Sequence, residues 1–178
     1  MEKYMRIAFD MQAFQSVNKI GGIGRYNFDF INTLFTLRPE YEYTLYFNGR
    51  DTEKIAQRFP NLTTCRSKSI PYLPGNDLNS RNGWVHYLNY RFASMDIFHI
   101  LSPFEDQKHT VISSTNIPAK TVVTLYDFIP YIFKETYLPS REALEKYMQR
   151  AEVVKSADHI VSISEATRQD AIRLFDIP

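Results

Sequence analysis

Three glycines and an arginine form the first group in the chain that could bind a ligand. They lie in the segment Gly21-Gly22-Ile23-Gly24-Arg25, which follows an apolar run ending at Phe9 and opens a helical pattern. Glycines let the backbone turn tightly and approach a ligand closely, and the N-terminus of a helix offers unpaired N–H groups and a positive dipole end. Arg25 adds a guanidinium fork. The segment predicts a site for phosphate or carboxylate; a plain turn before a helix is the alternative interpretation.

The glycine segment is not the fingerprint of a dinucleotide-binding protein. That motif requires Gly-x-Gly-x-x-Gly, whereas the third residue after Gly24 is Asn27. The turn between the strand and the glycines is also too long for the motif. A nicotinamide-dependent oxidoreductase is therefore a weak interpretation.

Three further polar groups follow predicted strands. They are the segment Ser102 to Glu105, the pair Tyr126 and Asp127, and the pair Ser164 and Glu165. Asp127 could orient a sugar hydroxyl, act as a base or cap its loop, and capping is the ordinary role of an aspartate in a turn. Glu105 faces either a ligand or solvent. Because ligands of parallel sheets bind at the carboxyl ends of strands, we expect these groups to converge at one edge.

Metal and nucleophilic chemistry have little support. The chain has one cysteine and four histidines; the histidines show no metal-binding spacing, and no Ser-His-Asp set can be assembled. His99 lies within a predicted strand and is interpreted as a core histidine. We expect no metal and no cofactor.

Composition restricts the kind of partner. The net charge of +1 gives no basic excess for nucleic acid. No apolar run approaches the roughly 18–20 residues that span a bilayer. An aromatic and basic stretch at 84–92 is typical of a packed surface helix, or of a helix lying on a membrane.

Strands and helices must alternate to position these groups. Strands are predicted at 5–9, 41–47, 62–67, 96–101, 121–125 and 159–163. Helices are predicted at 22–37, 51–59, 79–94, 140–156 and 164–175, with loops at 11–19, 70–78 and 128–137. The order predicts an α/β domain with a Rossmann-like parallel sheet and helices on both faces. Strand 121–125 is apolar on both faces, which favours a central position.

Four segments together resemble one enzyme family. They are Gly21 to Tyr26, Asp96 to Glu105, Thr121 to Pro130 and Ala157 to Thr167. In order and spacing they resemble the N-terminal half of the retaining nucleotide-sugar glycosyltransferases of family four, which have the two-domain GT-B architecture. The resemblance covers nearly the whole chain of 178 residues.

The resemblance implies sugar transfer from a nucleotide-sugar donor, with retention at the anomeric carbon, to a glycan or lipid-linked acceptor in cell-envelope polysaccharide synthesis. It points the donor diphosphate to Gly21, Gly22 and Gly24, and the guanidinium of Arg25 completes the predicted diphosphate site. Acceptor or sugar binding falls to Ser102, Glu105, Ser164 and Glu165, and a catalytic role to Tyr126 and Asp127. The nucleotide-sugar is a substrate, and no metal is implied. The expected location is cytoplasmic, with peripheral contact at the inner face of the membrane.

Two departures from the family pattern bear on these expectations. Many members have histidine where this chain has Tyr126, and tyrosine, with a pKa of about 10, is a poor proton shuttle at neutral pH. Residues 1–178 match a single acceptor-side domain, and the donor-binding C-terminal domain is absent from the sequence. We therefore expect the isolated chain to be inactive. The alternative is a stand-alone α/β module that binds a phosphorylated or carboxylated small molecule.

Overall fold

The computed structural model describes residues 4–48, 52–59, 66–70, 94–104 and 118–177. Its centre is a six-stranded sheet in the order β3-β2-β1-β4-β5-β6, with every pairing parallel. The strands are β1 (Arg6–Asp10), β2 (Glu42–Asn48), β3 (Arg66–Ile70), β4 (Ile97–Ile100), β5 (Lys120–Leu125) and β6 (His159–Ser162). The α/β, Rossmann-like fold expected from the sequence is confirmed.

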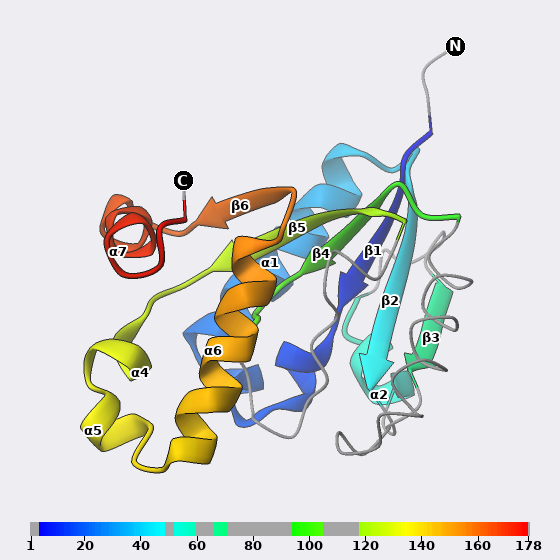
Figure 1. Ribbon diagram of the computed structural model, residues 1–178. Helices are drawn as coiled ribbons and strands as arrows, with labels where there is room; N and C mark the ends of the chain where they lie inside the picture. The colour runs from blue at the N-terminus through cyan, green and yellow to red at the C-terminus, as the bar shows by residue number, and fades with distance from the viewer. Residues whose placement is uncertain (1–3, 49–51, 60–65, 71–93, 105–117, 178) are drawn as a thin grey trace, which may run out of the picture.

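Helices cover both faces of the sheet (Figure 1). On one face lie α1 (Gly22–Leu37) and the short α2 (Thr52–Ala56); on the other lie α6 (Arg141–Lys155) and α7 (Glu165–Phe175). Successive strand residues point to opposite faces. Ile7 and Phe9 therefore join the core beneath α1, whereas Ala8 joins the core beneath α6.

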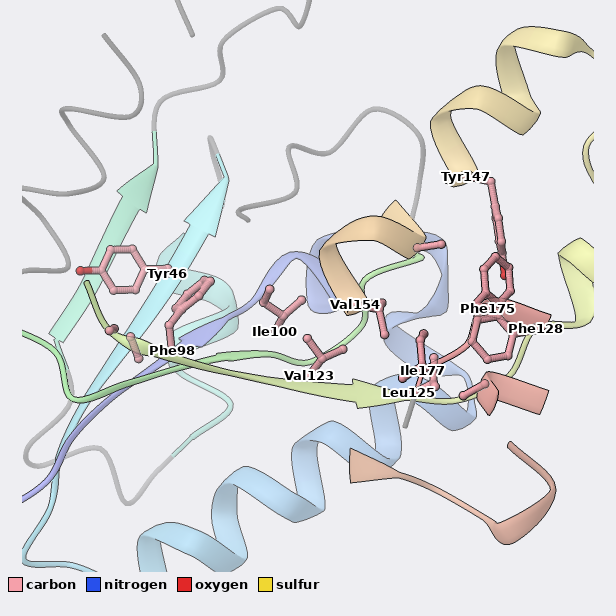
Figure 2. Packing of buried hydrophobic residues seen from close by; sticks show 14 of the residues in the cluster. Tyr46, Phe98, Ile100, Val123, Leu125, Phe128, Tyr147, Val154, Phe175 and Ile177 are labelled. Carbon is pink, nitrogen blue, oxygen red and sulfur yellow. The ribbon is translucent and has the colours of Figure 1, made fainter. Parts of the chain in front are cut away.

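The core on the α6 side extends past the end of β5. Figure 2 shows Phe128, Tyr147 and Phe175 together beyond the carboxyl end of that strand. The rings of Phe128 and Phe175 stack with centroids 4.7 Å apart, and Phe104 stacks on Tyr147 at 4.5 Å. Because these rings come from the loops after β4 and β5 and from both helices, they hold those loops firmly against the sheet.

A buried histidine, His99, lies in the core on the α1 side. Its Nε2 atom lies 2.8 Å from Oγ1 of Thr124 on the neighbouring strand. The ring contacts Phe9 and Phe30, with centroids 5.8 and 5.3 Å away. Burial lowers the pKa of His99 to about 4, so the side chain is neutral at physiological pH. The interpretation as a core histidine is confirmed.

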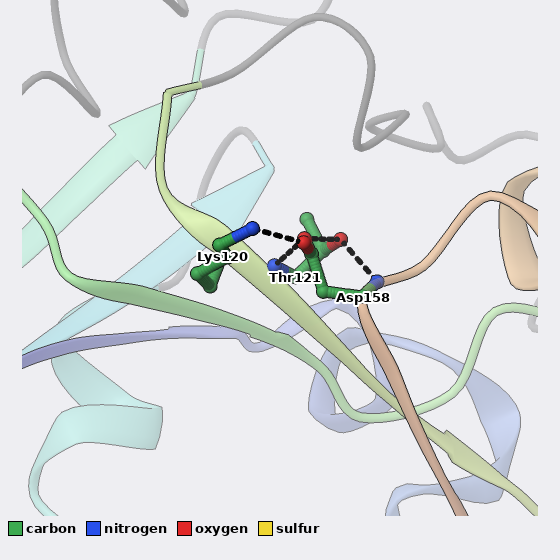
Figure 3. Close-up of polar contacts among 3 residues, drawn as sticks. All are labelled: Lys120, Thr121 and Asp158. Carbon is green, nitrogen blue, oxygen red and sulfur yellow. Dashed lines mark hydrogen bonds and ion pairs between the residues drawn. The ribbon is translucent and has the colours of Figure 1, made fainter.

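A polar cluster joins the amino ends of β5 and β6 (Figure 3). Asp158 accepts hydrogen bonds from Lys120 Nζ at 2.6 Å and from the Thr121 N–H at 2.8 Å. The hydrogen bond from Lys120, followed by that from the Thr121 backbone, lowers the pKa of Asp158. The cluster fixes the register of β6 at the edge of the sheet opposite the strand ends that carry the predicted site.

Two predictions about strands were wrong. The third strand was expected at 62–67, but β3 is Arg66–Ile70, in register with Thr44 to Asn48. An edge strand pairs on one side only and tolerates polar residues, so its apolar pattern is weak. The strand at 121–125 is not central: β5 is second from the edge. It is apolar because β4 and β6 flank it and helices cover both faces.

The segments expected as loops at 11–19 and 128–137 contain short helices. Residues 128–137 contain α4 (Ile129–Ile132) and α5 (Lys134–Tyr137), and residues 11–20 contain the 3₁₀ turns η1 (Gln12–Gln15) and η2 (Val17–Ile20). Pro130 lies in the first turn of α4, where it costs no hydrogen bond. Helix α2 is shorter than predicted.

Several predicted segments lie outside the described residues. They are the helix predicted at 79–94, except its last residue Ser94, the aromatic and basic stretch at 84–92 within it, and the loop predicted at 70–78, except Ile70, which ends β3.

Candidate functional site

The N-terminus of α1 is open. Gly21 is its N-cap residue, in extended conformation, and no side chain in the described part of the chain caps the helix. A Cβ added at Gly22 would meet no atom within 4 Å, so packing does not require glycine there. Arg25 is exposed and forms no ion pair with any of the described residues. Because the first backbone N–H groups of a helix lack intrahelical acceptors, this end can donate hydrogen bonds to a ligand.

The other two long helices that follow a loop are capped by serine. Ser140 Oγ accepts the N–H of Ala143 at α6, and Ser164 Oγ accepts the N–H of Thr167 at α7, each at 3.1 Å. These side chains occupy donors that remain open in α1. Of these three long helices among the described residues, α1 is therefore the one whose start can receive an external anion.

Tyr126, the residue after β5, joins three elements. Its hydroxyl donates to Asn27 Oδ1 of α1 at 2.6 Å, and its backbone carbonyl accepts the hydroxyl of Thr167 in α7 at 2.6 Å. Its ring meets Tyr26 edge to face, with centroids 5.7 Å apart. The structure thus brings the end of β5 against the first turns of α1, as the convergence of strand ends predicted.

Asp127 acts as a turn residue in this structure. Its Oδ1 atom accepts the N–H of Ile129 at 2.9 Å, which starts α4. Its charge also contributes, after burial, to raising the pKa of the Tyr147 phenol. The capping interpretation made from the sequence is confirmed, and the catalytic role stays a prediction.

The predicted sugar-binding residues after β6 line a shallow depression. The cavity has a volume of about 310 Å³ and is lined by Ile160, Ser162, Ser164, Glu165, Arg168, Ala171 and Ile177. Within it Glu165 accepts hydrogen bonds from Arg168 at 2.7 Å and from Gln169 at 2.7 Å. The Arg168 bond is the main reason that the pKa of Glu165 falls to about 2. Ser164 therefore caps its own helix, and Glu165 is engaged by two side chains of that helix.

The loop after β4 is only partly described. Ser102 is buried, and the adjacent carbonyl of Pro103 accepts a hydrogen bond from the Arg150 guanidinium of α6 at 3.4 Å. Glu105 lies outside the described residues. The acceptor roles of Ser102, Glu105, Ser164 and Glu165 stay predictions.

Sequence reasoning missed polar residues at core positions. Asn27 is fully buried and Asp10 is 5% exposed. Asp10 ends β1, and its carboxylate accepts the N–H and the side-chain amide of Gln12 at 3.0 and 2.9 Å. A signal for Asn27 was available, because it precedes Ile31 and Phe35 at four-residue steps on the apolar face of the predicted helix.

Within the described segments, no group of three or more His, Cys, Asp or Glu side chains could hold a metal ion. The expectation of a metal-free site stays a prediction. Among the same residues, no helix is long and apolar enough to cross a membrane.

Comparison with known proteins provides relatives for this fold and site. No family model matches the chain. A serotype-specific mannosyltransferase of Escherichia coli, WbdA, is 26% identical over 189 residues, which cover 97% of this chain and 22% of the relative. A second protein of the same name is 36% identical over 86 residues, or 47% of this chain and 11% of its own length. The predicted resemblance to glycosyltransferases is confirmed.

A solved structure shares the fold. Anabaena Alr3699/HepE, crystallised in complex with UDP and glucose, matches with a TM-score of 0.55 and 18% identity, covering 96% of this chain and 41% of the HepE chain. The chain therefore spans about a fifth of the length of the mannosyltransferase and about two-fifths of HepE.

Proposed function

We propose that this chain is the N-terminal, acceptor-side domain of a retaining glycosyltransferase. The enzyme would move a sugar from a nucleotide-sugar donor to a glycan or lipid-linked acceptor in the synthesis of a cell-envelope polysaccharide. The observation that carries this proposal is the sequence match to a mannosyltransferase along 97% of the chain. A GT-B enzyme closes its cleft with a second domain, which here would supply the rest of the donor site.

The open N-terminus of α1 would hold the donor diphosphate. Gly21 and Gly22 are exposed and Gly24 is buried, and none of the three places a side chain between the backbone donors and a ligand. Arg25 places an exposed cation in the first turns. Negative charge develops on the diphosphate as the sugar departs. Preorganised backbone donors, the helix dipole and a guanidinium stabilise that charge without a metal ion.

The acceptor would approach the carboxyl ends of β4, β5 and β6. The side chains available there are hydroxyls and carboxylates, which suit sugar hydroxyl groups, and Tyr126 and Asp127 lie at the middle of the three strand ends. Nucleotide-sugars are cytoplasmic substrates, so the enzyme would work in the cytoplasm. A lipid-linked acceptor would bring it to the inner face of the membrane.

A titration of isotopically labelled chain with UDP and GDP, followed by NMR, tests the diphosphate site. We expect the amides of residues 21–25 to shift, with weak affinity because one domain supplies only part of the cleft. Gly22→Ala should reduce affinity because its methyl group enters the open space at the helix end. Stability should stay within about 0.5 kcal/mol, because the helical backbone at Gly22 accepts alanine.

Arg141→Ala is the matched control, since Arg141 is the first residue of α6 and its side chain is 92% exposed. It should leave the shifts unchanged. Equal binding by wild type and Gly22→Ala would contradict the diphosphate site. Sugar transfer by the 178-residue chain alone, or its tight saturable binding of a nucleotide-sugar, would contradict the one-domain assignment; tight binding without transfer would favour the small-molecule module.

A further inference from the structure

Strand β6 is an open edge of the sheet. It is the last strand in the sheet order (Figure 1), and among the described strands it pairs only with β5. His159 is exposed and the other three residues of β6 are half-buried, whereas the last three residues of β4 are buried. Ile163, which follows β6, is 46% exposed. An edge strand leaves backbone N–H and C=O groups that another strand can bind.

The open backbone groups of β6 belong to Ile160 and Ser162. The Ile163 N–H donates to the Leu125 carbonyl of β5 at 3.1 Å, and the backbone groups of alternate residues in a parallel ladder point to the same side. Those of Val161 therefore also face β5, while those of Ile160 and Ser162 point away from it. Neither of these two residues has a backbone hydrogen-bond partner outside the ladder among the described residues.

The two edges of the sheet differ in the residues that discourage strand addition. The sequence of β3 contains Arg66 and Lys68, and charged residues, lysine especially, commonly protect an edge strand from pairing. Residues 159–163 are His-Ile-Val-Ser-Ile, without a lysine, arginine, aspartate or glutamate. Three of the five are β-branched and favour extended structure. The β6 edge therefore lacks the charged protection that the β3 sequence contains.

The β6 edge is complementary to a second copy of itself. In an antiparallel pair with a two-fold axis at Val161, Ile160 lies opposite the partner's Ser162. These are the residues whose backbone groups are open, and each such pair exchanges two N–H···O=C bonds. His159 then lies opposite the partner's Ile163, so that no like charges meet.

The depression beside β6 offers space for a side chain of that second copy. Ile160 and Ser162 both contribute to its lining, together with Ala171 and Ile177. Residues directly opposite each other in an antiparallel pair lie on the same face of the sheet. The partner's Ile160, opposite Ser162, would therefore enter the depression, and apolar surface would leave water on both copies.

We propose that β6 is a dimerisation edge, at which a second copy of this chain adds its own β6 in the antiparallel direction and extends the sheet. The inference goes beyond the proposed function, because it requires neither a ligand nor a second domain. A strand of four residues gives a short contact, so we expect a weak dimer whose population rises with protein concentration.

Val161→Cys in a Cys65→Ser background tests the register of the pair. The two copies of residue 161 lie opposite each other at the axis, in a pair without hydrogen bonds, where the Cβ atoms are close enough for a disulfide. Mild oxidation should therefore give a covalent dimer. Ile132→Cys in the same background is the matched control, because Ile132 is 42% exposed and lies on α4, away from β6 (Figure 1). It should stay mostly monomeric.

Sedimentation at increasing concentration measures the dimer without a cross-link. Ser162→Pro removes an N–H that points away from β5, so the monomer should fold. The dimer should weaken about tenfold or more, because each of the two pairs loses a hydrogen bond. Val161→Lys should weaken it about fivefold, since two ammonium groups would lie opposite each other. Ile132→Lys should leave association unchanged.

Several results would overturn the inference. A wild-type chain that stays monomeric at millimolar concentration would reject the dimer, and slow amide exchange at Ile160 and Ser162 in that monomer would show that a segment of the same chain covers the edge. Equal cross-linking through residues 161 and 132, or a dimer that Ser162→Pro leaves unchanged, would place the contact elsewhere. These outcomes are independent of the UDP titration, which tests the proposed function.

Discussion

The N-termini of α1 and α7 differ in whether a side chain accepts hydrogen bonds from their first backbone N–H groups. Both helices begin beside the carboxyl ends of parallel strands, where ligands of such folds bind. Helix α7 is capped by Ser164 and carries Glu165, which is held by Arg168 and Gln169. Helix α1 begins at an uncapped glycine and has no acidic residue in its first turn. The start of α7 therefore has a hydrogen-bond acceptor from its own residues, whereas the N–H donors at the start of α1 are open to a ligand.

The contrast explains why polar character alone is a poor guide to a site. Ser164 and Glu165 have the more reactive side chains, yet their groups are engaged within their own helix. The glycines offer no side-chain chemistry, yet their backbone donors are open. The difference also predicts how each region responds to acid, to added charge and to loss of a cap.

The largest expected effect is on the stability of the α1 side in mild acid. His99 packs beneath α1 against Phe30, and its pKa falls from 6.5 to about 4 on folding. The unfolded chain takes up the proton first, so this stability is present above pH 6.5 and is lost as the pH falls towards 4. Between pH 7 and pH 5 we expect a loss of about 2 kcal/mol.

Urea unfolding at the two pH values measures this loss. The variant His99→Leu should lose much less stability over that interval. If the wild type is equally stable at pH 7 and pH 5, His99 can be protonated in the folded state without loss of stability, which would contradict the prediction.

The next effect concerns charge placed at each helix start. Gly22→Asp should weaken UDP binding about tenfold or more, because a carboxylate there repels phosphate and occupies the donors, while it also favours the helix dipole. Ala166→Asp puts the same charge in the first turns of α7, at an exposed position. It should leave UDP binding unchanged. Equal losses in the two variants, measured by calorimetry or NMR, would remove the distinction between the helices.

A smaller effect tests the caps directly. Ser164→Ala should cost about 1 kcal/mol, because the Thr167 N–H loses its acceptor. Gly21→Ala, at the N-cap of α1, removes no side-chain cap and should change stability by about 0.5 kcal/mol or less. Chemical unfolding of both variants gives the comparison. A cost at Gly21 as large as that at Ser164 would show that the α1 start is not open.

The smallest effect is expected at Glu165 below pH 4.5. Its pKa falls from 4.5 to about 2 in the folded state, chiefly through Arg168. The interaction is therefore complete above pH 4.5 and is lost as the pH falls towards 2. Amide exchange at Thr167 and Arg168 should quicken over that interval, and Glu165→Gln should remove the change. The first turn of α1 has no carboxylate and should show no matching transition.

The alternation of elements and the glycine segment could be predicted from the sequence. Helix α1 has the predicted bounds, because its apolar residues recur at helical spacing and Pro39 follows its end. The edge strand β3 was less predictable. It is displaced from its predicted position because an edge strand needs no apolar pattern. The short helices α4 and α5 depend on Asp127, Pro130 and the aromatic core beneath them. No periodic pattern in the sequence predicts these two helices.

The sequence by itself determined the parallel α/β fold, the location of the glycine segment after β1 and the order of the strand ends. These follow from local periodicity and from the rule that parallel strands share a carboxyl edge. Only the tertiary structure decided which polar groups are free to act. Asn27 meets Tyr126 across 99 residues of chain, and Glu165 is occupied by neighbours on its own helix. Whether a donor is capped, buried or open depends on atoms brought together by packing, and spacing along the chain does not contain that information.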